Sequence, residues 1–152
     1  MQPHPDFAET DLPRRAEIGA FQLTPLSPAQ VDEDFEAVIG SKQVLKGLFG
    51  DDWPLGLTRD DNLTDMGWHE REFTAKRSFA WIIRDPGGRY LGCAYLYPDL
   101  GKRGHGQVVT WVRDSPDRIA QLTQFDRLFQ TWLRSYLPDR YILSWLNNAG
   151  IS

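Results

Sequence analysis

Cysteine, histidine and long hydrophobic runs are all scarce in this sequence. Cys93 is the only cysteine and cannot form an internal disulfide, so we expect a reducing, cytoplasmic environment. The three histidines, His4, His69 and His105, have no metal-ligand spacing, so we expect no metal site. No run approaches the ~18 continuous apolar residues of a membrane span. Residues 1–15 also lack the apolar middle of a signal peptide, so we expect no membrane partner.

An excess of basic residues is missing as well. The net charge is −4, with 17 Lys and Arg against 21 Asp and Glu. A nucleic-acid-binding domain normally carries a basic face, so we expect no nucleic-acid partner. There is no internal repeat, and 152 residues suit one domain with its own core. We therefore expect a single domain over residues 1–152, in which residues 1–18 form a flexible N-terminal arm.

The most regular part of the chain spans residues 79–113 and reads as three β-strands. The first run alternates its side chains, and the second is apolar on both faces, as in a strand that is covered on both sides. Asp85-Pro86-Gly87-Gly88 separates the first two runs, and Pro98 with a glycine cluster separates the second from the third. These features predict an antiparallel meander with strands over 79–84, 90–97 and 107–113.

Helix signals flank this meander on both sides. Ser27-Pro28 and Ser115-Pro116 each combine a capping serine with a proline at the first helical position. Apolar residues at helical spacing follow both dipeptides. In chain order, we expect a strand over 20–26, a helix from 28 to about 39, a short helix ending near 50, a helix over 62–77, the meander, a helix from 116 to about 137, and a strand over 141–146.

This order of elements resembles the GNAT (Gcn5-related) N-acetyltransferase fold over roughly residues 21–149. The likeness rests on Trp53-Pro54 before the second helical region, Leu91-Gly92-Cys93 in the third strand and Trp111-Val112-Arg113 closing the fourth. Leu146-Asn147-Asn148-Ala149 is similar to the end of the family's fifth strand. The resemblance implies an α+β, α/β sandwich-like fold with a mixed, mostly antiparallel sheet flanked by helices. Because the chain ends at Ser152, that fold would be short at the C-terminus, without the family's later tyrosine acid.

The same resemblance implies acetyl-CoA as the cosubstrate, lying between the fourth and fifth strands. Its pantetheine would pair with the fourth strand, and its pyrophosphate would lie on backbone N–H groups at the start of the following helix. The implied cofactor-binding residues are Trp111, Val112, Arg113, Arg118 and Asn147.

The segment after the fourth strand departs from the family's pattern. The family has a glycine signature there, whereas residues 113–120 read RDSPDRIA and contain no glycine. Pro116 donates no N–H, and Asp114 and Asp117 place negative charge where phosphates would lie. Arg113 and Arg118 would compensate for part of this charge.

Candidate catalytic residues come mainly from the second helical region, which borders the amine substrate in the family. A general base must remove a proton from an ammonium group, and His69, Glu70 or Glu72 suits that role. Asp99, after the third strand, is a further candidate. The alternative is that residues 69–72 form a solvated helix face and that Asp99 is only a turn residue.

Two functional hypotheses follow. The first is an N-acetyltransferase that transfers an acetyl group from acetyl-CoA to a small amine by direct attack. The second is a noncatalytic binding or regulatory domain of the same fold that has lost CoA binding. Because native proteins usually cover exposed sheet edges, a homodimer through the last strand is an additional hypothesis.

Overall fold

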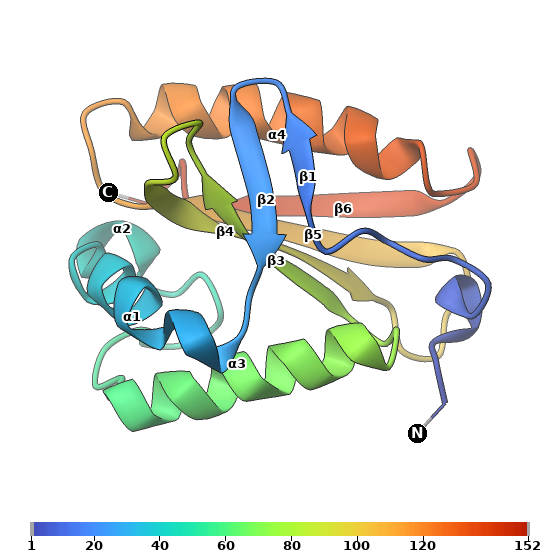
Figure 1. Cartoon of the computed structure of the whole chain (residues 1–152), viewed down its shortest axis with the longest axis horizontal. Helices are drawn as coiled ribbons and strands as arrows, with labels where there is room; N and C mark the ends of the chain where they lie inside the picture. Colours follow the sequence, from blue (N-terminus) through green and yellow to red (C-terminus); the bar gives the residue numbers. More distant parts are fainter. Residues whose placement is uncertain (1, 152) are drawn as a thin grey trace.

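A six-stranded sheet forms the centre of the molecule (Figure 1). The computed structural model describes residues 2–151, and the strands lie side by side in chain order. Neighbouring strands are antiparallel except for the last pair, which is parallel. The predicted α+β fold with a mixed, mostly antiparallel sheet is therefore confirmed. The strands are β1 (Ala16–Ile18), β2 (Phe21–Pro25), β3 (Phe79–Arg84), β4 (Tyr90–Pro98), β5 (His105–Val112) and β6 (Ile142–Asn147).

Helices cover both faces of this sheet and produce two cores. Helices α1 (Val31–Ile39), α2 (Lys42–Leu45) and α3 (Arg59–Thr74) lie on one side, and α4 (Arg118–Arg134) lies on the other (Figure 1). Successive residues of a strand point to opposite faces. In β3, Trp81 therefore packs into the core beneath α4 while Ile82 packs into the core beneath α1 and α3. No helix within residues 2–151 is long and apolar enough to cross a membrane.

Two helical segments start as capping chemistry predicts, whereas the start predicted at Ser115-Pro116 is wrong, because α4 begins at Arg118 after Asp117 and has no side-chain cap. The Ser27 hydroxyl accepts a hydrogen bond from the N–H of Ala29, and the Gln30 side chain accepts one from the N–H of Ser27. Helix α3 begins at Arg59, three residues earlier than expected. The reason is a second capping box, in which the side chains of Thr58 and Asp61 accept hydrogen bonds from each other's backbone N–H groups.

The N-terminal segment differs from the flexible arm that the sequence suggested. Residues 5–7 form a short 3₁₀ helix, and the ring of Phe7 is buried 4.9 Å from that of Phe79. The indole of Trp81 donates a hydrogen bond to the carbonyl oxygen of Pro13 at 2.8 Å. Strand β1 then pairs with β2. The segment is held in place because Phe7 and Leu12 supply apolar surface to the core.

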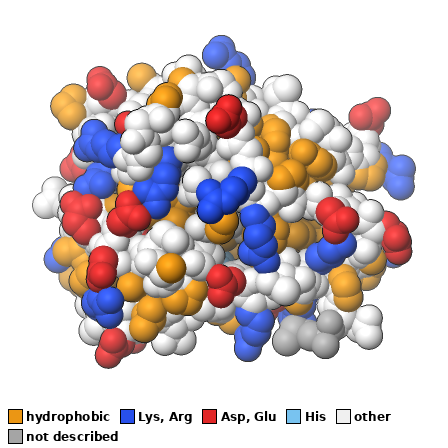
Figure 2. Space-filling view, viewed as in Figure 1, with side chains coloured by type: hydrophobic (Ala, Val, Ile, Leu, Met, Phe, Trp, Pro, Cys, Tyr) orange, Lys and Arg blue, Asp and Glu red, His pale blue; other side chains and the backbone are white. Residues whose placement is uncertain are grey.

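Charged side chains of both signs are intermixed over the face shown in Figure 2, with apolar patches between them. On the face covered by α4, the apolar side chains of Leu122, Phe125 and Phe129 are buried. Ile119, whose helical spacing predicts a place in the same buried stripe, is 55% exposed.

Gly92 of β4 lies against the backbone of β5. This residue pairs with Val112, and a Cβ atom at position 92 would lie 1.9 Å from the carbonyl oxygen of Trp111. The obstructing atom belongs to a central strand and cannot move without breaking the ladder. Only glycine fits here.

We expect Gly92→Ala to lower the free energy of unfolding by about 3 kcal/mol, measured by urea denaturation, because the added methyl group overpacks the sheet. Gly67→Ala in α3 is the matched control, since its added Cβ would make an ordinary 3.7 Å contact with Pro28. The control should gain up to about 1 kcal/mol from the higher helix propensity of alanine. Equal stabilities of the two variants would contradict the close approach.

Candidate functional site

A cavity of about 440 Å³ lies between α1, α3 and β4 and is bordered by the loop that precedes α3. Aromatic side chains form much of its wall, and three carboxylate side chains reach it from α1 and α3. We call this cavity the aromatic pocket. Its aromatic residues are Phe49, Trp53, Trp68, His69, Tyr95 and Tyr97, and its acidic residues are Asp34, Asp61 and Asp65.

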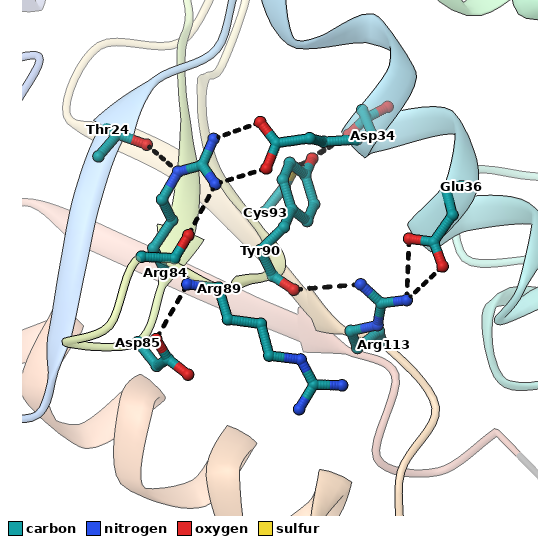
Figure 3. A network of polar contacts seen from close by, with 11 residues as sticks. Thr24, Asp34, Glu36, Arg84, Asp85, Arg89, Tyr90, Cys93 and Arg113 are labelled. Atoms are coloured by element: carbon teal, nitrogen blue, oxygen red, sulfur yellow. Dashed lines mark hydrogen bonds and ion pairs between the residues drawn. The ribbon is translucent and has the colours of Figure 1, made fainter.

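Asp34 lies at the buried base of the aromatic pocket. Its carboxylate accepts a hydrogen bond from the Tyr90 hydroxyl of β4 (Figure 3). It accepts another, at 2.7 Å, from the Asn62 amide of α3. The Cys93 thiol donates to the same carboxylate at 3.6 Å. Burial raises the pKa of Asp34, and it raises the pKa values of Tyr90 and Cys93 well above their usual range. Tyr90 and Cys93 therefore keep their protons and act as donors.

Two arginine–glutamate pairs fix α1 against the sheet edge of the pocket. Arg84 donates two hydrogen bonds to Glu33, at 2.8 and 2.9 Å. Arg113 donates through Nη2 alone to both carboxylate oxygens of Glu36, at 2.8 and 2.9 Å, and its Nη1 donates to the carbonyl oxygen of Tyr90 (Figure 3). The bidentate pair of Arg84 and Glu33 restricts orientation as well as distance. Arg113, an expected cofactor-binding residue, is thus engaged in holding α1.

Of the four expected catalytic residues, His69 lines the aromatic pocket. It is buried, and its Nε2 lies 3.3 Å from a carboxylate oxygen of Asp65 one helical turn away. Its ring packs against Trp68 and Tyr95, with centroids at 5.0 and 5.2 Å. The neighbouring carboxylate and the two rings orient the imidazole toward the cavity wall.

The other three expected catalytic residues lie outside the pocket. Glu70 is exposed on the solvent side of α3. Glu72 is buried and pairs with Arg77 at 2.9 Å. Asp99 is in the turn after β4, where its carbonyl oxygen contacts His4 at 2.8 Å, and it borders a different cavity. Helix spacing explains Glu70, which lies on a different face of α3 from His69. Glu72, three residues after His69, shares the buried face but is paired with Arg77.

The end of β5 is occupied by an internal side chain. The carboxamide of Asn148 accepts a hydrogen bond from the N–H of Val112 at 3.2 Å and donates one to its carbonyl oxygen at 3.0 Å. It also donates to the carbonyl oxygen of Val44 at 3.1 Å and is fully buried. Asn148 therefore makes the pair of contacts that a neighbouring strand would make with Val112.

Arg118, at the start of α4, faces the same segment. Its guanidinium donates hydrogen bonds to the carbonyl oxygens of Asn148 and Ile151, the latter at 2.9 Å. Residues 148–151, which we call the terminal segment, therefore cover both the end of β5 and the side chain of Arg118. Trp111, also expected to contact the cofactor, is buried with its indole N–H 3.4 Å from the Tyr95 hydroxyl.

The side chain of Asn147, the expected asparagine, does not contact Val112, although its backbone pairs with Thr110 of β5. Its amide donates to Asp126 at 2.8 Å, and its oxygen accepts from the N–H of Ala149 at 2.9 Å. Adjacent residues of a strand point to opposite sides. The doubled asparagine at 147 and 148 was the signal in the sequence that one of the two would face each way.

The end of β5 and the loop that follows it differ in their binding chemistry. The Asn148 carboxamide shows that the backbone of Val112 binds an amide group, which is the functional group that pantetheine offers. In the loop, Asp114 and Asp117 are negative, and the N–H of Asp114 is bonded to the Ser41 hydroxyl at 2.9 Å. Pro116 has no N–H. Arg113 is paired with Glu36, so Arg118 is the arginine of this segment that is not paired with a carboxylate, and a guanidinium can bind phosphate.

The comparisons with known proteins place the chain in a fold. No protein-family model matches the sequence, and no curated protein matches it. Solved structures do match, among them the ribosomal L7/L12 alpha-N-protein acetyltransferase RimL in complex with coenzyme A, at a TM-score of 0.66 and 13% identity, over 80% of this chain and 67% of that chain.

Two further solved structures agree with this. One is the microcin C7 self-immunity acetyltransferase MccE in complex with acetyl-CoA and AMP, at a TM-score of 0.61 and 9% identity, over 84% of this chain and 72% of that one. The other is a GCN5-related N-acetyltransferase from Brucella melitensis, at a TM-score of 0.58 and 19% identity, over 90% of this chain and 60% of that one. The chain thus has the fold of GNAT acetyltransferases, as its sequence suggested.

The raised pKa of Asp34 predicts a distinct pH dependence of stability. Above the ordinary pKa of 3.8, the folded state keeps a proton on Asp34 that the unfolded state has lost. The contribution of Asp34 to the free energy of unfolding is therefore greatest below that pH and falls as the pH rises through the raised pKa. Relative to wild type, Asp34→Asn should become progressively more stable from about pH 4 upward.

Asp32→Asn is the control, because Arg59 lowers the pKa of Asp32 by hydrogen bonding. That contribution is present above 3.8 and is lost as the pH falls, so this variant should become less stable relative to wild type as the pH rises. Urea denaturation at several pH values measures both. Differences that run in the same direction for the two variants would contradict the assignment.

Proposed function

We propose that the protein is an acetyltransferase that transfers an acetyl group from acetyl-CoA to a small amine in the aromatic pocket. The observation that carries this proposal is the amide-to-backbone pairing of Asn148 with Val112. An internal carboxamide there acts as a stand-in for an amide of pantetheine. The fold, which is that of known acetyltransferases bound to CoA or acetyl-CoA, supports the same reading.

Binding of the cosubstrate requires the terminal segment to leave its position. Withdrawal of Asn148 exposes the N–H and C=O groups of Val112. The same movement frees the guanidinium of Arg118 from two carbonyl oxygens, and phosphate oxygens would replace them. One displacement therefore uncovers both parts of the proposed cosubstrate site.

His69 is the proposed general base. An amine enters as the ammonium form, and the imidazole accepts its proton while Asp65 stabilises the resulting positive charge. The neutral nitrogen then attacks the acetyl carbonyl carbon. Acetyl-CoA supplies that activated carbon, and its C–S bond breaks as the C–N bond forms, so that CoA departs as the thiolate. The acylated nitrogen then releases its second proton to solvent, and the thiolate takes up a proton from solvent, which leaves the neutral amide and CoA.

A noncatalytic binding domain is the second candidate function. Asp114, Pro116 and Asp117 favour it, because this loop has neither the charge nor the N–H groups for a pyrophosphate. In this case the terminal segment would stay in place permanently, and only the aromatic pocket would bind a ligand.

Calorimetric titration with acetyl-CoA and with free CoA separates the two candidates. We expect Asn148→Ala to bind acetyl-CoA about tenfold more tightly than wild type, because the internal competitor for Val112 is removed. Without ligand, the variant should lose about 1–3 kcal/mol of stability, since it leaves backbone groups unpaired. Asn147→Ala is the matched control and should bind as wild type does.

Absence of binding at millimolar acetyl-CoA, in wild type and in Asn148→Ala alike, would rule out acetyl transfer and leave the binding domain. A circular-dichroism spectrum unchanged from wild type establishes that Asn148→Ala is folded in that experiment. If Asn147→Ala bound acetyl-CoA more tightly and Asn148→Ala did not, the proposed competing role of Asn148 would be wrong.

The role of His69 is tested by kinetics with 2-phenylethylamine as the acceptor. We expect His69→Gln to lower kcat by about 100-fold, because the glutamine amide cannot accept the ammonium proton. The KM for acetyl-CoA should stay unchanged, since His69 lies on α3 and not beside Val112. Glu70→Gln, one residue along the same helix but exposed, should keep the wild-type kcat; equal losses in both variants would refute the assignment.

A further inference from the structure

The charged side chains that line the aromatic pocket favour a positively charged ligand. Three carboxylates line it, from Asp34, Asp61 and Asp65, and no Lys or Arg of residues 2–151 is among its lining residues. The cavity beside α2 is different, because Lys42 and Lys46 border it together with two aspartates. An anion in the aromatic pocket would have no cationic side chain to pair with, so the pocket disfavours carboxylates and phosphates.

The aromatic rings of the pocket pack against one another in stacked and edge-on pairs. Tyr95 and Tyr97 are stacked with centroids 5.8 Å apart and planes 8° apart. Phe49 meets Trp53 and Tyr95 edge-on, at 4.8 and 5.1 Å. The face of an aromatic ring attracts a cation, and the attraction grows when water is excluded. Rings also supply apolar surface for the body of a ligand.

The carboxylates divide between the base and the rim of the pocket. Asp34 at the base is buried and already accepts hydrogen bonds from Tyr90 and Asn62. Asp61 and Asp65 lie one helical turn apart on α3, and the side chain of Asp65 is 61% exposed. A charged group that enters between the rings therefore meets Asp65 at the rim while the buried Asp34 lies beneath it.

A metal ion is a poor match for this set. Within the described residues there is no group of three or more His, Cys, Asp and Glu side chains that could hold one. The wall is aromatic rather than rich in oxygen atoms, whereas hard cations require six or more oxygen ligands.

We infer that the aromatic pocket selects a small organic cation with an apolar body, that is, an alkyl- or arylalkylammonium. This inference deepens the proposed function, on which it rests in taking the pocket as the acceptor site. The ammonium group lies against the ring faces and the Asp65 carboxylate, and the hydrocarbon body contacts the remaining rings. A long peptide chain is not required, since the recognition elements all lie within one cavity of about 440 Å³.

The test is a calorimetric titration of the full chain with three probes that share one ring and one chain length. These are 2-phenylethylammonium, 2-phenylethanol and phenylacetate, which are positive, neutral and negative. We expect the cation to bind at least about tenfold more tightly than the alcohol, and phenylacetate not to bind, because only the cation pairs with the rings and carboxylates.

Two substitutions assign the selectivity to the pocket. Asp65→Asn should weaken binding of the cation about fivefold and leave binding of the alcohol unchanged, because it removes charge and keeps shape. Trp68→Leu should weaken binding of the cation about threefold, because it removes an aromatic ring from the pocket. Glu70→Gln removes the same charge from the same helix outside the pocket and should have no effect on any probe.

Equal affinity for the cation and the alcohol would overturn the inference while leaving the pocket as a binding site. Tighter binding of phenylacetate, or equal losses in Asp65→Asn and Glu70→Gln, would overturn it as well. No binding of any probe at millimolar concentration would also overturn it. The titration with acetyl-CoA needs no ligand in the pocket, so the proposed acetyl transfer stands or fails separately.

Discussion

The buried carboxylate of Asp34 is the interaction on which the geometry of the pocket depends. It joins α1 to β4 through Tyr90 and to α3 through Asn62, so three elements distant in sequence meet at one group. Burying a carboxylate opposes its ionisation, and the surrounding donors offset only part of that effect. Loss of either donor would leave an unpaired buried acceptor, which costs about 1–3 kcal/mol. The walls of the pocket are therefore set by a polar contact and not by apolar packing alone.

A second constraint lies at the end of β5, where an internal group and an external one would compete for the same backbone. Strands β5 and β6 pair up to Thr110 and Asn147, and beyond this point Asn148 takes over the contacts to Val112. The Asn148 side chain makes three hydrogen bonds here, to Val112 and to Val44, and Arg118 holds its backbone carbonyl. A side chain thus satisfies the N–H and C=O of Val112 where the pairing of β5 and β6 ends.

Much of the fold was predictable from local chemistry. The strands of residues 79–113 followed from alternation and turn residues, and Ser27 with Gln30 marked a helix start that the structure contains. The site was harder to predict from the sequence, because its aromatic and acidic residues are spread from Asp34 to Tyr97 and meet only in the folded chain. The choice between Asn147 and Asn148 depended on the facing of one strand, and the packing of Phe7 depended on a distant core. Neither is encoded in local sequence.

A contact between two side chains connects the aromatic pocket to the end of β5. Tyr95 lines the pocket, and its hydroxyl lies 3.4 Å from the indole N–H of Trp111, the residue before Val112. Trp111 faces the core beneath α1 and α3, while the backbone of Val112 faces the terminal segment. An amine among the rings and an amide on Val112 would therefore lie on adjacent parts of the same strand pair. The proposed direct attack would require the amine to be held beside the reacting carbon, since a bound nucleophile gains most of its advantage from that position.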